Sequence, residues 1–107
     1  MRQWGKNGHM ETWEFEADLW PWKDETDAWI FVTAPPDVTE EIREASIATG
    51  PPRGFGSVRV EARIGTTTWR TSVFPGQEGY ALPIKKDVRR REDLQVGDRA
   101  LVSITLV

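Results

Sequence analysis

The carboxyl-terminal third of the chain follows a plan that few small folds use. Apolar residues 80–84 contain Pro83, a basic segment covers 85–91, and Gly97-Asp98 precedes a second apolar run at 99–106. This order indicates a strand, a helical turn, a tight turn and a strand. A looser copy runs from Trp29 to Ile64. Two copies in 107 residues predict an all-β fold, a small closed six-stranded β-barrel with one or two short helices.

Period-two alternation of apolar and polar residues locates the strands. In the first strand, Trp13 to Leu19, the odd-numbered residues face inward, and Trp20-Pro21-Trp22 ends it. In the strand Val58 to Ile64 the even-numbered residues face inward. If these two strands are neighbours, the outward Arg59 and Arg63 pair with acids of the first strand. The predicted strands are 13–19, 28–32, 58–64, 67–74, 80–84 and 99–106.

The run Ala28–Val32 is apolar at every position, so it is predicted to be the central strand and to be covered on both faces. After Pro35-Pro36, the pair Asp37 and Glu40 resembles a capping box and predicts a helix with one apolar face, formed by Val38, Ile42 and Ala45. Five of the six tryptophans precede residue 30. Large aromatic side chains complete small cores, so a core role is preferred to ligand binding.

The length suits one domain, predicted to span residues 10–107. Residues 1–9 have no periodicity and are expected to be disordered or left from cloning, with Gly8-His9-Met10 as the junction. Cysteine is absent, and the sequence shows neither a long apolar run nor a signal-peptide pattern. A cytoplasmic protein with no membrane contact is therefore expected. The net charge of −3 argues against a general nucleic-acid coat.

The sequence contains no recognisable catalytic pattern. Its single histidine, His9, lies in the segment expected to be disordered, so a histidine dyad or a His-rich metal site is excluded. The acids Asp24, Glu25 and Asp27 belong to a polar turn and are expected to be solvated rather than to bind a metal. No phosphate loop, nucleophile elbow or dinucleotide fingerprint is present. We therefore predict a protein that is not an enzyme and uses no cofactor.

Two overlapping sets of residues are candidates for binding. Polar groups next to large aromatics are typical of small-ligand sites. Core and capping roles for these residues remain the alternative. A basic helix can instead contact phosphates, although acids interleave its cations. The ligand candidates are Trp69, Thr71, Ser72, Lys85 and Arg89, and the nucleic-acid candidates are Lys85, Lys86, Arg89, Arg90 and Arg91. Phe55, in a glycine-rich loop, is a further contact candidate, although a mobile, dispensable loop is the preferred interpretation.

Two resemblances sharpen the fold. The segment 82–89 together with Val96-Gly97-Asp98-Arg99 resembles the swapped-hairpin barrels of the AbrB and MazE type, which are shorter and bind DNA as dimers. Over residues 13–106 the chain is similar to the bacterial family known as domain of unknown function nineteen-oh-five, a single-chain double-split barrel. The matching segments are 15–20, 28–32 with Pro36, 58–60, 64–65 with 69–72, 79–80 with 82–83, and 88–89 with 97–98.

The family resemblance implies a fold and carries no activity to transfer. The chain departs from the family in its dense charges at 89–93 and in its tryptophan-rich start. We therefore expect a non-catalytic binding or interaction module for a small ligand or a protein partner, as a monomer or a homodimer. An AbrB-like DNA-binding barrel is the alternative, and a small enzyme is the third hypothesis.

Overall fold

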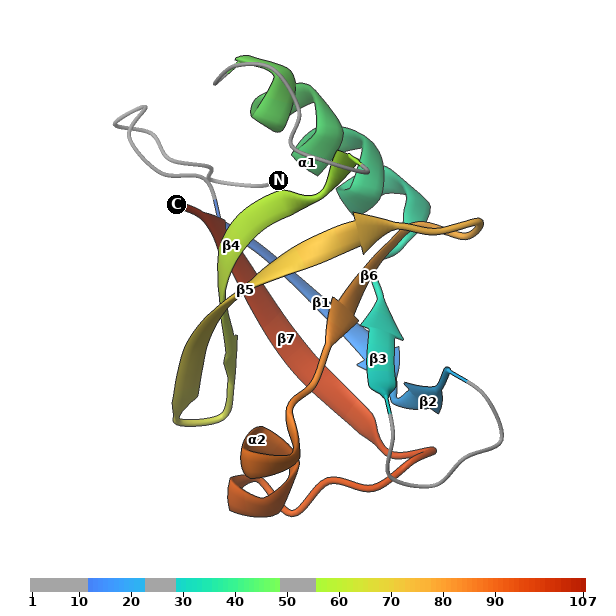
Figure 1. Ribbon diagram of the computed structural model, residues 1–107, viewed down its shortest axis with the longest axis vertical. Coiled ribbons are helices and arrows are strands. Elements are labelled where there is room, and N and C mark those ends of the chain that lie inside the picture. Colours follow the sequence, from blue (N-terminus) through green and yellow to red (C-terminus); the bar gives the residue numbers. More distant parts are fainter. Residues whose placement is uncertain (1–11, 23–28, 49–55) are drawn as a thin grey trace.

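The computed structural model describes residues 12–22, 29–48 and 56–107. These residues form one curled antiparallel sheet with two helices at its opposite ends (Figure 1). The prediction of an all-β fold with short helices is confirmed at this level. The strands are β1 (Thr12–Asp18), β2 (Trp20–Pro21), β3 (Ile30–Thr33), β4 (Val58–Ile64), β5 (Thr67–Pro75), β6 (Tyr80–Pro83) and β7 (Arg99–Leu106), and the helices are α1 (Pro36–Ala48) and α2 (Lys86–Arg91).

The sheet has the strand order β1-β7-β4-β5-β6-β3-β2, so β1 and β2 are its two end strands. Only Leu19 separates these strands in the chain. Leu19 donates its backbone N–H to the carbonyl of Asp98 and accepts one from Gly97, both at 2.9 Å. The sheet is therefore a half-barrel whose two ends share one stretch of chain. The predicted count of six is replaced by seven, because Trp20-Pro21 pairs with β3 instead of ending the first strand.

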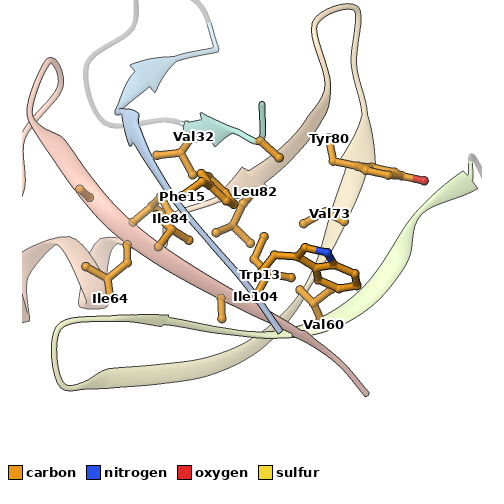
Figure 2. Packing of buried hydrophobic residues seen from close by; sticks show 14 of the residues in the cluster. Trp13, Phe15, Val32, Val60, Ile64, Val73, Tyr80, Leu82, Ile84 and Ile104 are labelled. Atoms are coloured by element: carbon orange, nitrogen blue, oxygen red, sulfur yellow. The ribbon is translucent and has the colours of Figure 1, made fainter. Parts of the chain in front are cut away.

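The apolar faces of the strands gather in one core (Figure 2). All four predicted inward residues of β4 are buried, and so are Trp13, Phe15 and Leu19 of the first strand. Burial of a large apolar side chain stabilises a fold by about 1.5–3 kcal/mol, so this cluster dominates the packing energy. The predicted inward faces of β1, β4 and β7 are confirmed.

The condition for pairing Arg59 and Arg63 with the acids of β1 is not met, because β7 lies between β1 and β4. Alternation identifies the two faces of a strand but not the strand beside it. The acids of β1 consequently meet Arg99 of β7, at 3.1 Å from Glu16 and 3.2 Å from Asp18. Arg59 instead donates to the Ser72 hydroxyl, and Arg63 to the Gly65 carbonyl.

Helix α1 begins one residue before the predicted cap. Pro36 occupies its first position, where a missing N–H costs nothing. Asp37 lies in the first turn, and its carboxylate accepts the backbone N–H of Val38 at 2.9 Å. The capping box was therefore wrong, and Glu40 forms an ion pair with Arg43. The predicted apolar face is confirmed, with Val38 and Ile42 buried and Ala45 against the core.

The suspected duplication is visible as the units β3-α1-β4 and β6-α2-β7. Strand β3 pairs antiparallel with β6, and Val32 lies opposite Leu82. Two flanking bonds repeat around this pair: Ala34 N–H to the Tyr80 carbonyl at 2.9 Å, and Ile84 N–H to the Ile30 carbonyl at 2.8 Å. Equivalent residues of the two units are therefore fifty positions apart around this pair.

Several predictions concern residues outside the described part of the chain. These are the boundary between residues 1–9 and the domain, the acids Asp24, Glu25 and Asp27, His9, and Phe55.

Candidate functional site

Four aromatic side chains gather on the outer face of β2 and β3. Trp20 lies directly opposite Phe31 across the two strands, with ring centroids 5.2 Å apart and planes at 25°. Trp29 stacks on Phe31 at 6.2 Å and 18°, and Trp22 lies 6.3 Å from Phe31 at 55°. We call Trp20, Trp22, Trp29 and Phe31 the aromatic cluster.

The aromatic cluster overturns two expectations. Trp22 is 58% exposed and Trp29 is 59% exposed, so neither belongs to the core. The outer face of β3 was expected to be covered, yet Phe31 and Thr33 on this face are only half-buried and line a groove. Strand alternation in the sequence already indicated this outcome. Ile30 and Val32 face inward, so Trp29 and Phe31 face outward. Trp20 and Trp22 are also two residues apart and share a face in the same way.

A groove of about 1150 Å³ runs along this face. Its walls come from both end strands of the sheet and from the turn that joins β5 to β6. We call it the aromatic groove; it is lined by Ala17, Asp18, Trp20, Trp22, Phe31, Thr33, Phe74, Pro75, Gly76, Gln77, Glu78, Gly79 and Ala81.

Hydrogen bonds fix the aromatic wall of the groove. The indole Nε1 of Trp20 donates to the Thr33 hydroxyl at 2.8 Å. The backbone N–H of Trp22 donates to the Trp29 carbonyl, also at 2.8 Å, and extends the β2–β3 pairing by one more contact. The side-chain hydrogen bond therefore orients the ring of Trp20, and the backbone bond sets the position of Trp22 beside Trp29.

The opposite wall is the turn of residues 76–79. Gly76 donates its N–H to the Gly79 carbonyl at 3.1 Å and closes the turn. Gly79 is buried, with a φ of +148°, and lies against α1's start: an ideal β-carbon there would be 2.4 Å from the Ala34 carbonyl oxygen. The backbone of Tyr80 then donates to the Thr39 hydroxyl at 3.1 Å. These contacts hold Glu78 at the rim.

Among the described residues, the charged side chains that line the groove are both acids, Asp18 and Glu78. Asp18 shares Arg99 with Glu16, and these hydrogen bonds, that to Glu16 first, raise the pKa of Arg99. Glu78 is exposed and has no ion pair or hydrogen bond within the described residues. The groove therefore combines flat apolar faces with negative charge.

A smaller hollow of about 400 Å³ lies on the other side of the same turn, between it and α1. Tyr80, Arg43 and Glu40 line it. Figure 2 shows the Tyr80 hydroxyl directed away from the other labelled core side chains. Burial raises the pKa of Tyr80, and the nearby Arg43 partly opposes this effect.

The predicted ligand residues of β5 lie away from the aromatic groove. Trp69 is buried in the core, and its indole Nε1 has no hydrogen-bond partner in the described residues. Thr71 is half-buried on the same side of the strand, whereas Ser72 faces the other way and accepts from Arg59 at 3.4 Å. None of the three lines the groove. Their role in ligand binding stays a prediction.

The basic residues lie on α2 and just before it. Lys85 precedes the helix and is exposed, as are Lys86, Arg90 and Arg91. Arg89 is half-buried and donates its Nε to the Ile84 carbonyl at 3.2 Å, a contact that supports the helix. The nucleic-acid role predicted for this set therefore depends on the exposed residues rather than on Arg89.

The described residues contain no cluster of three or more His, Cys, Asp or Glu that could hold a metal ion. Within the same residues, neither helix has the length and apolar character needed to cross a membrane. The chemistry that the aromatic groove itself offers is stacking, apolar burial and attraction of positive charge.

The comparison with protein families gives a match that covers most of the chain. The model of a family described as a domain of unknown function (DUF1905) matches residues 15–104. This range includes β2, β3 and the turn of residues 76–79, so the aromatic groove lies within the matched part of the chain. No curated protein matches the chain.

Proposed function

The chain belongs to the DUF1905 family, and from that premise we propose that it is a binding module whose site is the aromatic groove. The observation that carries the proposal is the stack of Trp20 and Phe31, which are half-buried and line the groove, with Trp22 exposed in the same lining and Trp29 exposed beside it. Scattered exposed apolar residues are ordinary, but a fixed group of large rings in a groove is typical of a recognition surface.

The energetics favour a ligand with a flat or apolar group. Covering apolar surface contributes about 25 cal/mol per Å², and aromatic stacking adds about 0.5–1.5 kcal/mol per pair. The ring of Trp20 is already oriented by its hydrogen bond to Thr33, so ordering this ring on binding costs little side-chain entropy. The proposal includes no catalytic step, because within residues 12–22, 29–48 and 56–107 no acid–base pair with a matched geometry supports one.

The proposal extends to the fold and the location of the protein. We place the chain in the cytoplasm, which its lack of cysteine supports. We also propose that the bend at Leu19 closes the half-barrel into a ring, with β1 and β2 acting as one bent strand. This closure brings Asp18 and Trp20, one on each side of Leu19, to the same groove.

Binding of small aromatic probes tests the proposal. A fragment mixture of indole, phenol and quinoline compounds is followed by amide NMR shifts of the purified chain. Shifts confined to residues that line the groove support the proposal. Trp22→Ala should abolish them, whereas Leu101→Ala, which removes a similarly exposed apolar side chain from β7, should not. If the fragments cause the same amide shifts in Trp22→Ala as in the wild-type chain, the proposal is refuted.

Contact with duplex DNA through α2 is the weaker proposal. Lys86, Arg90 and Arg91 are exposed together on this helix and support it. Asp87, Glu92 and Asp93 stand among these cations, so the local field is weak on a chain of net charge −3.

A further inference from the structure

We propose that the aromatic groove binds an arginine side chain carried by an extended segment of a partner protein. This inference rests on the proposed function and names the chemistry of the ligand. Three features carry it: the sign of the charges in the groove, the shape of its aromatic wall, and its size.

The charges select a cation. Asp18 and Glu78 line the groove, and its lining contains no lysine, arginine or histidine among the described residues. Arg99 already compensates Asp18 in part, whereas Glu78 is left without a partner in the same part of the chain. A cationic group would complete the pairing at Glu78, and an anionic ligand would meet repulsion from both carboxylates.

The aromatic wall selects a guanidinium among cations. A guanidinium is planar, so it can stack on an indole or phenyl face and still direct its edge N–H groups at a carboxylate. Such a cation–π contact is worth about 0.5–1 kcal/mol at an exposed site. An ammonium group is a compact, strongly hydrated charge that cannot stack in this way. Trp22, with 58% of its surface exposed, offers such a face in the groove.

The size selects a chain segment over a free metabolite. The groove measures about 1150 Å³, above the range of about 300–1,000 Å³ that is usual for small-ligand pockets. It is also open along one side of the sheet, with walls from β1, β2, β3, β5 and β6. An extended peptide can place one arginine between the rings and Glu78 and lay its neighbours along Phe74 and Pro75.

The test uses the full chain and a set of short fluorescent peptides, identical except for one central residue. Arginine, citrulline, lysine and glutamate occupy that position, and anisotropy measures binding at low and moderate salt. Citrulline keeps the shape of arginine without its charge. We expect the arginine peptide to bind at least about fivefold more tightly than citrulline, with lysine in between.

Two matched variants locate the contact. Glu78→Gln should weaken the arginine peptide about two- to fivefold and leave the citrulline peptide unchanged. Glu44→Gln makes the same charge change on the exposed surface of α1, outside the groove, and should have no effect. Trp22→Ala should weaken both peptides, and a thermal melt confirms that each variant is folded.

The possible outcomes separate the two proposals. Equal binding of arginine and citrulline peptides, or equal effects of Glu78→Gln and Glu44→Gln, overturns the arginine inference. If the aromatic fragments still bind in a Trp22-dependent way, the proposed function stands without it. If neither fragments nor peptides bind, both proposals fail. Tighter binding of single-stranded DNA than of the arginine peptide also overturns the inference, since it would reveal a different class of ligand.

Discussion

Gly79 lies so close to Ala34 that the carbonyl oxygen of Ala34 occupies the space a side chain at position 79 would need. This contact joins the turn of residues 76–79 to the start of α1. The Thr39 hydroxyl strengthens the junction, donating to the Ala34 carbonyl at 3.2 Å and accepting from the Tyr80 backbone. One wall of the aromatic groove is therefore positioned by a helix that does not line it.

Gly79→Ala should destabilise the fold and move this wall. Its β-carbon would lie 2.4 Å from backbone, which cannot shift cheaply, and its φ of +148° disfavours any side chain. Gly97→Ala is the control, because Gly97 also has a positive φ, +93°, but open space around its β-carbon. In urea unfolding, Gly79→Ala should lower the free energy of unfolding by about 1–3 kcal/mol more than Gly97→Ala does. Equal costs would mean that the contact is not tight.

Thr33→Val should loosen the ring of Trp20. The substitution keeps the shape of the side chain and removes the acceptor of the Trp20 indole N–H. A hydrogen bond of this kind contributes about 0.5–1.5 kcal/mol to the free energy of unfolding. Thr68→Val, at an exposed position of β5, is the control. NMR should show faster hydrogen exchange at the Trp20 indole only in Thr33→Val, and unchanged exchange would contradict the assigned bond.

The stability of the fold should fall at high pH through Tyr80, the only tyrosine. Burial raises the pKa of Tyr80 in the folded chain above its ordinary value of about 10. Between these two values the folded state holds a proton that the unfolded state has lost, so the stabilisation is complete below about pH 10 and disappears as pH rises through the folded pKa. In the wild-type chain the free energy of unfolding should therefore decrease with pH across this range. In Tyr80→Phe this decrease should be absent. A phenolate that appears at or below its ordinary pH would refute the prediction.

Arg99→Gln should strengthen the binding of an arginine peptide. Arg99 pairs with Asp18 at 3.2 Å, so its removal leaves a second free carboxylate in the groove. Arg70→Gln is the matched control, because Arg70 is a similarly exposed strand arginine whose partner, Glu61, lies outside the groove. Anisotropy titrations should show about twofold tighter binding for Arg99→Gln alone. Identical affinities for the two variants would place Asp18 outside the binding surface.

The exposed cations of α2 should not contribute to the aromatic groove. Arg90→Ala and Arg91→Ala together should leave peptide affinity unchanged, because neither residue lines the groove. If the chain contacts DNA, the same double variant should weaken a gel shift and reduce its salt dependence. A wild-type chain that gives no shift at low salt removes the DNA proposal.

Much of the fold could be predicted because alternation reports burial directly. The inward faces of β1, β4 and β7 follow from residues such as Phe15, Val60 and Ile104, each of which faces the core. Strand order could not be obtained in this way. Any two amphipathic strands can pair, and the choice of β7 as the neighbour of β1 depends on the whole curled sheet.

The candidate site escaped prediction for a different reason. Tryptophan is common in small cores, and Trp13 and Trp69 follow that rule. Trp22 and Trp29 do not, because their positions in the alternation place them on the outer face. The tryptophan content of the chain suggested that these side chains are buried, whereas their positions in the strand alternation indicated that they face outward. The charged partner, Glu78, lies in a loop without periodicity, so only the folded turn brings it to the rings.

The fifty-residue offset between β3 and β6 explains why there is room for a ligand at all. Under it, the bulky Trp29 and Phe31 of the first unit correspond to Gly79 and Ala81 of the second, and both small residues line the groove. Identical halves would carry either two bulky sets, which would crowd this face, or two small ones, which would leave nothing to stack on. The hollow thus depends on this difference between the two units, so Ala81→Phe would make them alike at this position and would fill part of the groove.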